Sequence, residues 1–270
     1  VLWSESAFLF QVAEADADRE VGQAFARTLG AASIVGAVLD REHPPPARMF
    51  NAALLMDRTG RLRGRYDKHH LVPFGEYIPF AQYLPFLRSV VPEFAPVMAG
   101  SELFTFRFPT AQGEISFAPM ICFDAIFPEI NLEYAKQKPD FLVNPTNDAW
   151  YGYSSGPYQF LAKVRMRAIE AKRAVARPAY SGVTAIVLPT GELAPGAIDI
   201  GPVDSTLAPD INEPARLLIS DVPRLQGGTV YTSIGDVFAY ACAIFTVAAT
   251  VVAWRRSRKP REDKDASANA

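Results

Sequence analysis

The sequence predicts an α/β fold, a layered sandwich of sheets and helices that is followed by one transmembrane helix. Short apolar strand-like runs alternate with helical segments up to about residue 228, with some strands following one another directly. This alternation is typical of layered α/β proteins rather than of all-α or all-β ones. The composition then changes to an uncharged apolar stretch and a basic tail. We expect a folded domain over 1–228, a membrane helix over 229–254 and a disordered tail over 255–270.

The first half of the domain is expected to contain strands, one helix and a long loop. A strand ends at Leu2-Trp3 and leads to Glu5. Residues 15–29 read as an amphipathic helix with an acidic first turn. Residues 32–39 and 51–56 read as strands, and 64–76 as a loop.

The second half continues the alternation. The predicted elements, in order, are strands 104–108 and 115–121, a helix from Cys122 to near Gln137, strand 141–145, helix 158–176, and strands 183–188 and 216–220.

The apolar C-terminal stretch predicts a membrane helix. Val237 to Trp254 carries no charged residue. As a helix it spans roughly 27 Å, close to the thickness of a bilayer core. The basic segment 255–261 follows, so we expect the tail in the cytoplasm and the domain 1–228 outside it. The alternative is a buried core helix, which rarely runs into a basic cluster and a polar tail.

Composition narrows the function. A formal net charge of -2 gives no indication of nucleic-acid binding. No spacing of His, Cys or carboxylates resembles a metal site, and we expect no cofactor. The chain begins with Val1 rather than Met, so we expect further sequence upstream.

Cys122 is the strongest candidate for chemistry. It ends a strand-like run at a strand-to-helix corner, where a helix N-terminus can stabilise a thiolate. The other cysteine, Cys242, lies in the apolar C-terminal stretch, so we expect no disulfide between them. A lone thiol in an oxidising compartment indicates chemistry. The alternative is a small buried core residue.

A thiol nucleophile needs a base and a donor for the oxyanion. The three histidines do not suggest a base, because His43 lies in a proline-rich loop and His69 and His70 directly follow Lys68. A carboxylate and a lysine are then the natural partners of Cys122.

Several separated motifs resemble the nitrilase (carbon-nitrogen hydrolase) superfamily. Glu5 in Leu-Trp-Ser-Glu, Lys68 in Asp-Lys-His-His-Leu-Val-Pro-Phe-Gly-Glu and Cys122 in Ile-Cys-Phe-Asp resemble its Glu-Lys-Cys triad in order and separation. The Lys68 motif and Asn-Asp-Ala-Trp-Tyr-Gly at 147–152 are similar to the membrane branch of that superfamily, the apolipoprotein N-acyltransferases. The resemblance implies an α-β-β-α sandwich and covers roughly residues 1–254.

The resemblance also implies roles for these residues. Glu5 would be the general base and acid, Cys122 the nucleophile, and Lys68 a donor to the oxyanion together with a backbone N–H near Phe123. Glu76 would be a second carboxylate that orients the triad. The family often has Tyr-Glu after the cysteine, where this chain has Phe123-Asp124.

Three aromatic residues are expected at the substrate pocket, namely Phe74, Tyr77 and Trp150. The segment Pro79–Gly100 is rich in large apolar residues. It reads either as core packing or as a loop that dips into lipid beside the membrane anchor.

By resemblance, the expected activity is ping-pong acyl transfer in the bacterial inner membrane, with the catalytic domain on the periplasmic side. Cys122 would take an acyl chain from a phospholipid as a thioester, and the N-terminal amine of a diacylglyceryl-cysteine lipoprotein would then accept it. Two alternatives stay open. One is a membrane-tethered amidase that hydrolyses a small amide, and the other is a degenerate module that binds without catalysis.

Overall fold

The computed structural model describes residues 1–41, 48–81, 83, 97–111, 113–201 and 216–258. The chain divides into two compact units, Val1–Thr229 and Val230–Ala270. Each unit is described by itself below.

The first unit contains a four-stranded sheet with the order β1-β2-β3-β4. Its strands are β1 (Phe8–Ala13), β2 (Ser33–Asp40), β3 (Met49–Met56) and β4 (Leu62–Asp67). β1 runs parallel to β2, and the β2-β3 and β3-β4 pairs are antiparallel. Every residue of β3 is buried, as expected for a central strand covered on both faces. Helix η2 (Asp18–Arg27) packs Val21 and Ala26 onto the outer face of this sheet.

The second sheet has six strands in the order β10-β9-β8-β7-β6-β5. They are β5 (Phe106–Thr110), β6 (Gly113–Pro119), β7 (Phe141–Val143), β8 (Val175–Arg177), β9 (Val183–Val187) and β10 (Ile198–Asp199). The three central strands, β6, β7 and β8, are parallel. Helices α2 (Pro128–Gln137) and α3 (Gly156–Ala171) cover its outer face, where Ile130, Tyr134 and Val164 enter a common core.

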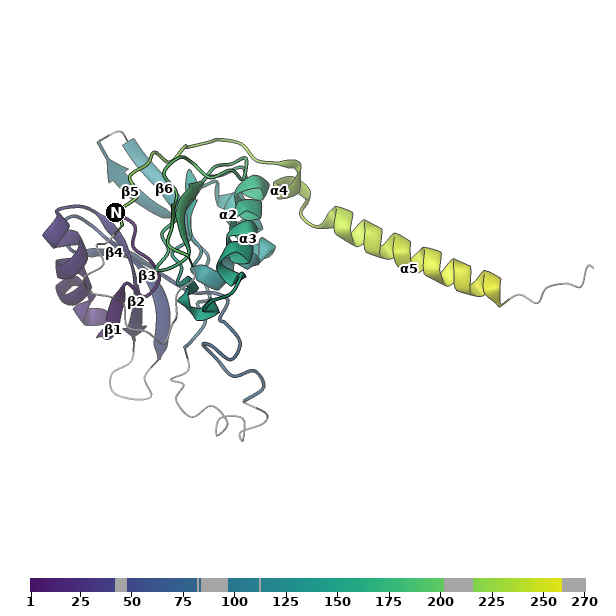
Figure 1. The fold of residues 1–270 in the computed structure, drawn as a ribbon, viewed down its shortest axis with the longest axis horizontal. Helices are drawn as coiled ribbons and strands as arrows, with labels where there is room; N and C mark the ends of the chain where they lie inside the picture. The colour runs from purple at the N-terminus through teal and green to yellow at the C-terminus, as the bar shows by residue number, and fades with distance from the viewer. Residues whose placement is uncertain (42–47, 82, 84–96, 112, 202–215, 259–270) are drawn as a thin grey trace, which may run out of the picture. The chain divides into compact units, whose positions relative to one another are not determined.

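The two sheets face each other. Ile34, Leu55 and Tyr66 of the first sheet pack with Phe117 and Val143 of the second in one buried cluster. Figure 1 shows the resulting layers of the first unit, with η2 in purple outside one sheet and α2 and α3 in green outside the other. The predicted α-β-β-α sandwich is therefore confirmed. In this arrangement each sheet is covered by the other sheet on one face and by helices on the opposite face.

Several predicted elements differ from the observed ones. The prediction misses β1, whose residues Leu9 and Phe10 are exposed on an edge strand and give no buried pattern. Helix α3 ends at Ala171, and the predicted helical end at 172–176 instead contains the start of β8. Residues 216–220 form no strand, and Leu2 makes only a single bridge to Ile34.

Two further corrections concern the segments that carry the motifs. The predicted loop over 64–76 begins with the end of strand β4. The predicted helix after Cys122 is divided into η3 (Cys122–Ile126) and α2. Pro128 explains the division, since proline lacks an N–H and is favoured at the first turn of a new helix.

The second unit contains α4 (Val230–Ile234) and α5 (Val237–Ser257). Within the described part of the chain, α5 is the one helix long and apolar enough to cross a membrane, with a mean hydropathy of 2.0. Arg258, beyond its C-terminal end, lies over the ring of Trp254 at 4.0 Å. This helix fits the predicted transmembrane helix.

Candidate active site

Lys68 directly follows β4, which ends at Asp67, and its side chain lies in the interior. Its backbone N–H donates to the carbonyl of Asn51 on β3 at 2.8 Å, and its carbonyl accepts from the N–H of Gly100 at 2.8 Å. The side chain is 1% exposed. A lysine is almost never buried to this extent unless its charge is paired.

Two carboxylates pair with Lys68. Its Nζ lies 3.0 Å from Oε1 of Glu5 and 3.0 Å from both oxygens of Glu76. The second oxygen of Glu5 accepts from the N–H of Asn147 at 2.9 Å, and that of Glu76 accepts from the N–H of Val72 at 2.9 Å. Each carboxylate is therefore fixed at both oxygens.

Gly36 on β2 allows the segment that carries Glu5 to approach the sheet closely. A Cβ at this position would lie 2.5 Å from the carbonyl oxygen of Ser4 and 2.6 Å from the nitrogen of Ser6. Both neighbours are backbone atoms that cannot turn aside, so only glycine fits beneath Glu5.

Asn51, which the sequence analysis does not single out, connects the two carboxylates. Its Nδ2 donates to Oε1 of Glu5 at 2.8 Å and to Oε1 of Glu76 at 2.8 Å. Both protons of the amide are thereby used. The available signal was an asparagine at the start of the apolar run 51–56, because this residue type is normally depleted in strands.

Cys122 lies at the corner after β6. Its φ of 43° is in the left-handed region, which is uncommon for residues other than glycine and often marks functional sites. Its N–H donates to the carbonyl of Pro145 at 2.8 Å. The side chains of Glu5 and Thr146 both influence the ionisation of its thiol. The structure thus brings Glu5, Lys68, Glu76 and Cys122 together.

The Cys122 sulfur is protonated at rest. Its pKa is raised to about 12, first by burial and then by the charge of Glu5, while Lys68 and the Thr146 side chain act in the opposite direction. The expectation that a helix N-terminus stabilises a thiolate is therefore wrong for the resting state. Burial in the cluster between the sheets outweighs the short helix η3.

Lys68, by contrast, stays charged. Burial alone would lower its pKa, but the neighbouring charges of Glu5 and Glu76 outweigh burial and raise the pKa above its ordinary value. The site therefore combines a neutral thiol, a permanent cation and two carboxylates in a buried volume. Such an arrangement can move a proton from sulfur to carboxylate and stabilise a developing oxyanion.

Asp124 connects the Cys122 corner to the Lys68 segment. It is fully buried and accepts from the Tyr66 hydroxyl at 2.8 Å, the His70 N–H at 2.7 Å and the Ile121 N–H at 3.0 Å. Burial raises its pKa to about 6 against these hydrogen bonds and the charge of Lys68. The Phe123 ring lies 5.3 Å from that of Phe127.

The aromatic residues expected at the pocket are all partly or largely exposed. Phe74 is 65% exposed, Tyr77 38% and Trp150 72%. The Phe74 N–H donates to the carbonyl of Tyr77 at 2.7 Å, which closes the turn that contains Glu76. Of the apolar segment Pro79–Gly100, residues 82 and 84–96 lie outside the described residues, so its expected role stays a prediction.

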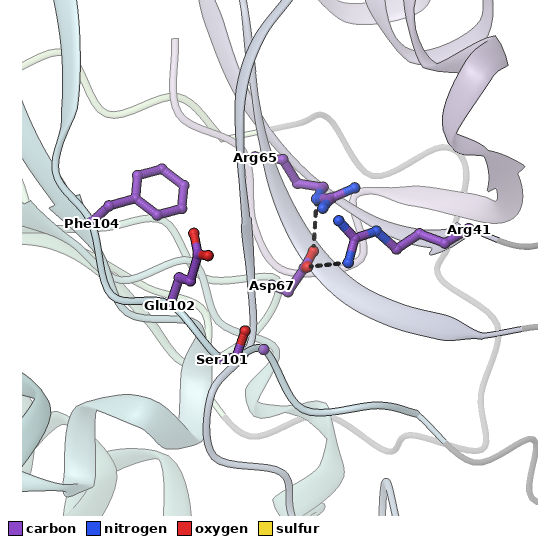
Figure 2. Close-up of a pocket in the computed structure, with 7 residues that line it drawn as sticks. Arg41, Arg65, Asp67, Ser101, Glu102 and Phe104 are labelled. Atoms are coloured by element: carbon purple, nitrogen blue, oxygen red, sulfur yellow. Dashed lines mark ion pairs between the residues drawn. The ribbon is translucent and has the colours of Figure 1, made fainter.

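A charged cavity of about 170 Å³ lies beside Asp67, the residue that directly precedes Lys68. Figure 2 shows Arg65 and Arg41 directed at Asp67, with Glu102 and Phe104 opposite. Arg65 Nε lies 3.0 Å and Arg41 Nη1 lies 3.6 Å from Asp67 oxygens. These ion pairs fix the end of β4 and so the position of Lys68. Among the described residues, no group of three or more His, Cys, Asp or Glu side chains could hold a metal ion.

This fold and this site define a member of a known class. The chain belongs to the carbon-nitrogen hydrolase family, whose profile matches residues 3–201. It is similar to the apolipoprotein N-acyltransferase of Geobacter metallireducens, with 34% identity over 258 residues that cover 95% of this chain and 46% of that protein. The apolipoprotein N-acyltransferase of Bradyrhizobium diazoefficiens is 34% identical over 262 residues, covering 95% of this chain and 45% of that protein. The predicted resemblance to this branch is confirmed, and the chain spans about half the length of these relatives.

Solved structures share the fold. The Saccharomyces cerevisiae member of branch 10 of the nitrilase superfamily matches with a TM-score of 0.50 and 18% identity over 69% of this chain and 62% of that one. A mutant amidase from Nesterenkonia sp. AN1 matches with a TM-score of 0.50 and 22% identity over 69% of this chain and 64% of that one. At these identities the likeness concerns the fold.

Proposed function

We propose that this chain carries the catalytic domain of an apolipoprotein N-acyltransferase, with Glu5, Lys68 and Cys122 as its catalytic residues. The observation that carries the proposal is the buried cluster in which Lys68 Nζ lies 3.0 Å from Glu5, whose charge acts on the buried Cys122 thiol. The names of the relatives at 34% identity supply the reaction. The acyl donor would be a phospholipid, and the acceptor a diacylglyceryl lipoprotein.

In the first half-reaction, the Cys122 sulfur passes its proton to Glu5 and attacks the carbonyl carbon of a phospholipid ester. The tetrahedral oxyanion accepts hydrogen bonds from the Lys68 ammonium and from a backbone N–H near Phe123. When the intermediate collapses, the ester C–O bond breaks and Glu5 returns the proton to the leaving alkoxide. A lysophospholipid departs, and Cys122 carries the acyl chain as a thioester.

In the second half-reaction, the acceptor amine attacks the thioester carbon. Glu5 takes a proton from the amine, the C–S bond breaks, and the proton passes back to the sulfur, which restores the thiol. Glu76 is a positioning residue in this scheme, because it bonds the opposite side of the Lys68 ammonium and fixes its direction. Asp124 positions the Cys122 corner through the Ile121 N–H.

The membrane helix suits this chemistry, because both substrates are held in lipid and a site at the bilayer surface meets them at high local concentration. We place the folded domain 1–228 on the periplasmic side of the inner membrane and the basic tail 255–270 in the cytoplasm. Arg255 and Arg256 in the last turn of α5 support this orientation under the positive-inside rule. We assign Phe74, Tyr77 and Trp150 to the substrate pocket. Their rings are exposed. Along the chain, Phe74 and Tyr77 lie on either side of Glu76, and Trp150 follows Asn147.

The test is a covalent adduct on Cys122. The chain is reconstituted with phospholipid, and peptide mass spectrometry looks for the mass of one fatty acyl chain on Cys122. We expect the adduct in the wild type and its loss in Glu5→Gln and Lys68→Ala. Tyr158→Phe should leave it unchanged, because the Tyr158 hydroxyl bonds the exposed Asp199, at 3.2 Å, and no residue of the site.

Two results would contradict the acyltransferase assignment. Turnover of small amides without any acyl adduct from phospholipid would identify a membrane-tethered amidase. Normal lipoprotein maturation in cells that carry Cys122→Ala would identify a module without catalysis.

A further inference from the structure

A fully buried ion pair joins the short helix η4 (Asp148–Tyr151) to the second sheet. Asp148 accepts two hydrogen bonds from Nη2 of Arg177, at 3.0 Å on one oxygen and 2.7 Å on the other. Arg177 is the last residue of β8, and its Nη1 donates to the carbonyl of Val183, the first residue of β9. A buried pair of this kind costs desolvation and is often no more stable than an apolar replacement. Stability alone therefore does not explain its presence.

The carboxylate of this pair is tied to the loop 144–147, which follows β7. The Thr146 hydroxyl donates to Oδ1 of Asp148 at 3.1 Å. The Thr146 backbone is also fixed, because its N–H donates to the carbonyl of Pro178 at 3.0 Å and its carbonyl accepts from the N–H of Tyr180 at 3.0 Å. The loop is therefore anchored from the side of the ion pair.

The same loop bonds both residues of the proposed proton transfer. The Pro145 carbonyl accepts from the Cys122 N–H at 2.8 Å. Two residues later, the Asn147 N–H donates to Oε2 of Glu5 at 2.9 Å. Three consecutive residues thus connect the nucleophile to its base. A shift of this segment would change the position of the thiol relative to the carboxylate.

The hydrogen bonds to Glu5 distinguish its two oxygens. Oε1 accepts from Lys68 Nζ at 3.0 Å and from Asn51 Nδ2 at 2.8 Å. Each oxygen of a carboxylate has two lone pairs. The two donors therefore use both lone pairs of Oε1, whereas the Asn147 N–H uses one of the two on Oε2. Oε2 is the oxygen suited to take the Cys122 proton.

We propose that Asp148 and Arg177 are positioning residues for the catalytic base. By fixing the loop at Asp148, the pair holds the Asn147 N–H against Oε2 of Glu5. In the step concerned, the S–H bond of Cys122 breaks, its electron pair stays on sulfur, and an O–H bond forms on Oε2. Neither member of the ion pair gains or loses a proton. The inference rests on the proposed roles of Glu5 and Cys122.

Each member of the pair needs the other, which decides the choice of variant. Burial raises the pKa of Asp148, while the charge of Arg177 and the hydrogen bonds from Arg177 and Thr146 act in the opposite direction. Removal of Arg177 alone would leave this carboxylate buried without its cation, which is strongly destabilising. Asp148→Asn combined with Arg177→Met removes both charges, keeps an acceptor for the Thr146 hydroxyl and leaves the net charge near Glu5 unchanged.

The test follows the acylation of Cys122. The full chain is reconstituted in vesicles of dioleoyl phosphatidylethanolamine and phosphatidylglycerol in equal amounts, and peptide mass spectrometry gives the rate at which Cys122 gains one oleoyl chain. The rate is recorded against lipid concentration and against pH. The matched control is Glu170→Gln combined with Arg167→Met, which removes another largely buried ion pair, 2.8 Å long and within α3.

The pH profile reports on Glu5 because the ionisable groups around it are kept in the double variant. The titratable side chains that face this cluster are those of Lys68, Glu76, Cys122, Asp124 and Tyr151. The variant retains each of them, and the two charges that it removes cancel.

The Asp148→Asn, Arg177→Met protein should acylate Cys122 at least about tenfold more slowly at saturating lipid, the effect of losing one hydrogen bond to an anion. The acidic limb of its pH profile should move upward by about one unit, because the Asn147 N–H bonds the ionised form of the Glu5 carboxylate. The lipid concentration that gives half the maximal rate should stay within about threefold, since the pair is buried. The control should match the wild type in all three measurements.

If the double variant does not fold by circular dichroism, Asp148→Asn alone takes its place, because it keeps the shape of the side chain. It is then compared with Glu170→Gln, which removes the carboxylate of the control pair. The same slowing and the same shift of the pH profile are expected for Asp148→Asn alone.

A folded Asp148 variant with the rate and pH profile of the wild type would overturn this inference and leave the proposed function intact. If Cys122 of the wild type gains no acyl chain at any pH, the proposed function fails, and this inference fails with it. A loss confined to the half-saturating lipid concentration, or an equal loss in the control, would show a general packing effect and refute the positioning role.

Discussion

The side-chain nitrogen of Asn51 lies 2.8 Å from Oε1 of Glu5, and through its second proton it reaches Glu76 at the same distance. One neutral amide thus separates two carboxylates that share a single ammonium. Its two N–H groups each bind one carboxylate, on the same oxygen that also contacts the Lys68 ammonium. Asn51 is in this respect as much part of the site as the residues found from the motifs.

The first prediction concerns this amide. Asn51→Asp replaces the donor by a third carboxylate next to Glu5 and Glu76, so one of these groups must take up a proton. A protonated Glu5 cannot act as a base, and we expect the initial rate of Cys122 acylation at neutral pH to fall by at least about 100-fold. Mass spectrometry of the acyl adduct over time gives the rate.

Asn131→Asp is the matched control. Asn131 is also buried and its Nδ2 also donates to a carboxylate, Glu170 at 3.3 Å, but it lies on α2. We expect its acylation rate to stay within about threefold of the wild type, since distant sites act independently. An Asn51→Asp protein that acylates as fast as the wild type would show that the amide does not govern Glu5.

The second prediction separates the charge of Glu5 from its role as a base. The Glu5 carboxylate raises the pKa of the Cys122 thiol, which is about 12 in the native protein. Glu5→Gln should therefore lower the thiol pKa by about one to two units while it abolishes acylation. Lys68→Met removes the stabilising cation and should raise the thiol pKa instead.

The ultraviolet absorbance of the thiolate, recorded against pH in a Cys242→Ala background, measures this midpoint. The Cys122→Ala variant supplies the baseline from tyrosine ionisation. A Glu5→Gln midpoint equal to or above that of the wild type would show that Glu5 and Cys122 do not interact as the structure has them.

The third prediction is a pH dependence of stability that arises from Asp67. Burial raises the pKa of Asp67 to about 6. The charge of Arg41 lowers this pKa, and the charges of Glu14 and Glu102 raise it. Because the native state holds this proton more tightly than the unfolded state, the contribution to stability is complete below about pH 4 and is lost as the pH rises through about 6. Asp67→Asn lacks this dependence.

Urea denaturation of both proteins in micelles at several pH values gives the comparison. The unfolding free energy of the wild type minus that of Asp67→Asn should fall by about 1–2 kcal/mol between pH 4 and pH 6.5, after allowance for partial exposure of the carboxyl. A difference that rises over this interval would contradict the prediction.

Asp57 gives a control of opposite sign. Hydrogen bonds from Thr59, Arg61 and Arg63 outweigh the effect of burial and lower the pKa of Asp57 below its ordinary value. Its contribution is therefore complete above about pH 4 and is lost as the pH falls below that value. The difference between the wild type and Asp57→Asn should rise with pH over the acidic range.

Much of the fold could be predicted from local patterns. The buried runs at 32–39 and 51–56 correspond to β2 and β3, because a strand covered on both faces reads as a continuous apolar segment. The exposed edge strand β1 and the three-residue strand β8 gave no such signal. Their pairing depends on neighbours that are distant along the chain, which a local pattern does not contain.

The residues of the candidate site also fall into those that the sequence could identify and those that it could not. Glu5, Lys68, Glu76 and Cys122 could be found because they sit in motifs with a recognisable order. Asn51 and Thr146 could not, since no motif marks either residue, and an asparagine in an apolar strand, although unusual there, does not reveal its partners. Their importance arises from partners that are distant in sequence, such as Glu5 for Asn51 and Arg177 for Thr146 through Asp148.

The sequence by itself determined the layered α/β class, the membrane helix and the identity of the residues with reactive groups, because these depend on residue type and local periodicity. Only the tertiary structure decided that the thiol is neutral at rest, that one amide separates two carboxylates, and that a buried ion pair orients the Thr146 hydroxyl. Protonation and orientation depend on burial and on charges within a few ångströms, and folding alone sets those distances.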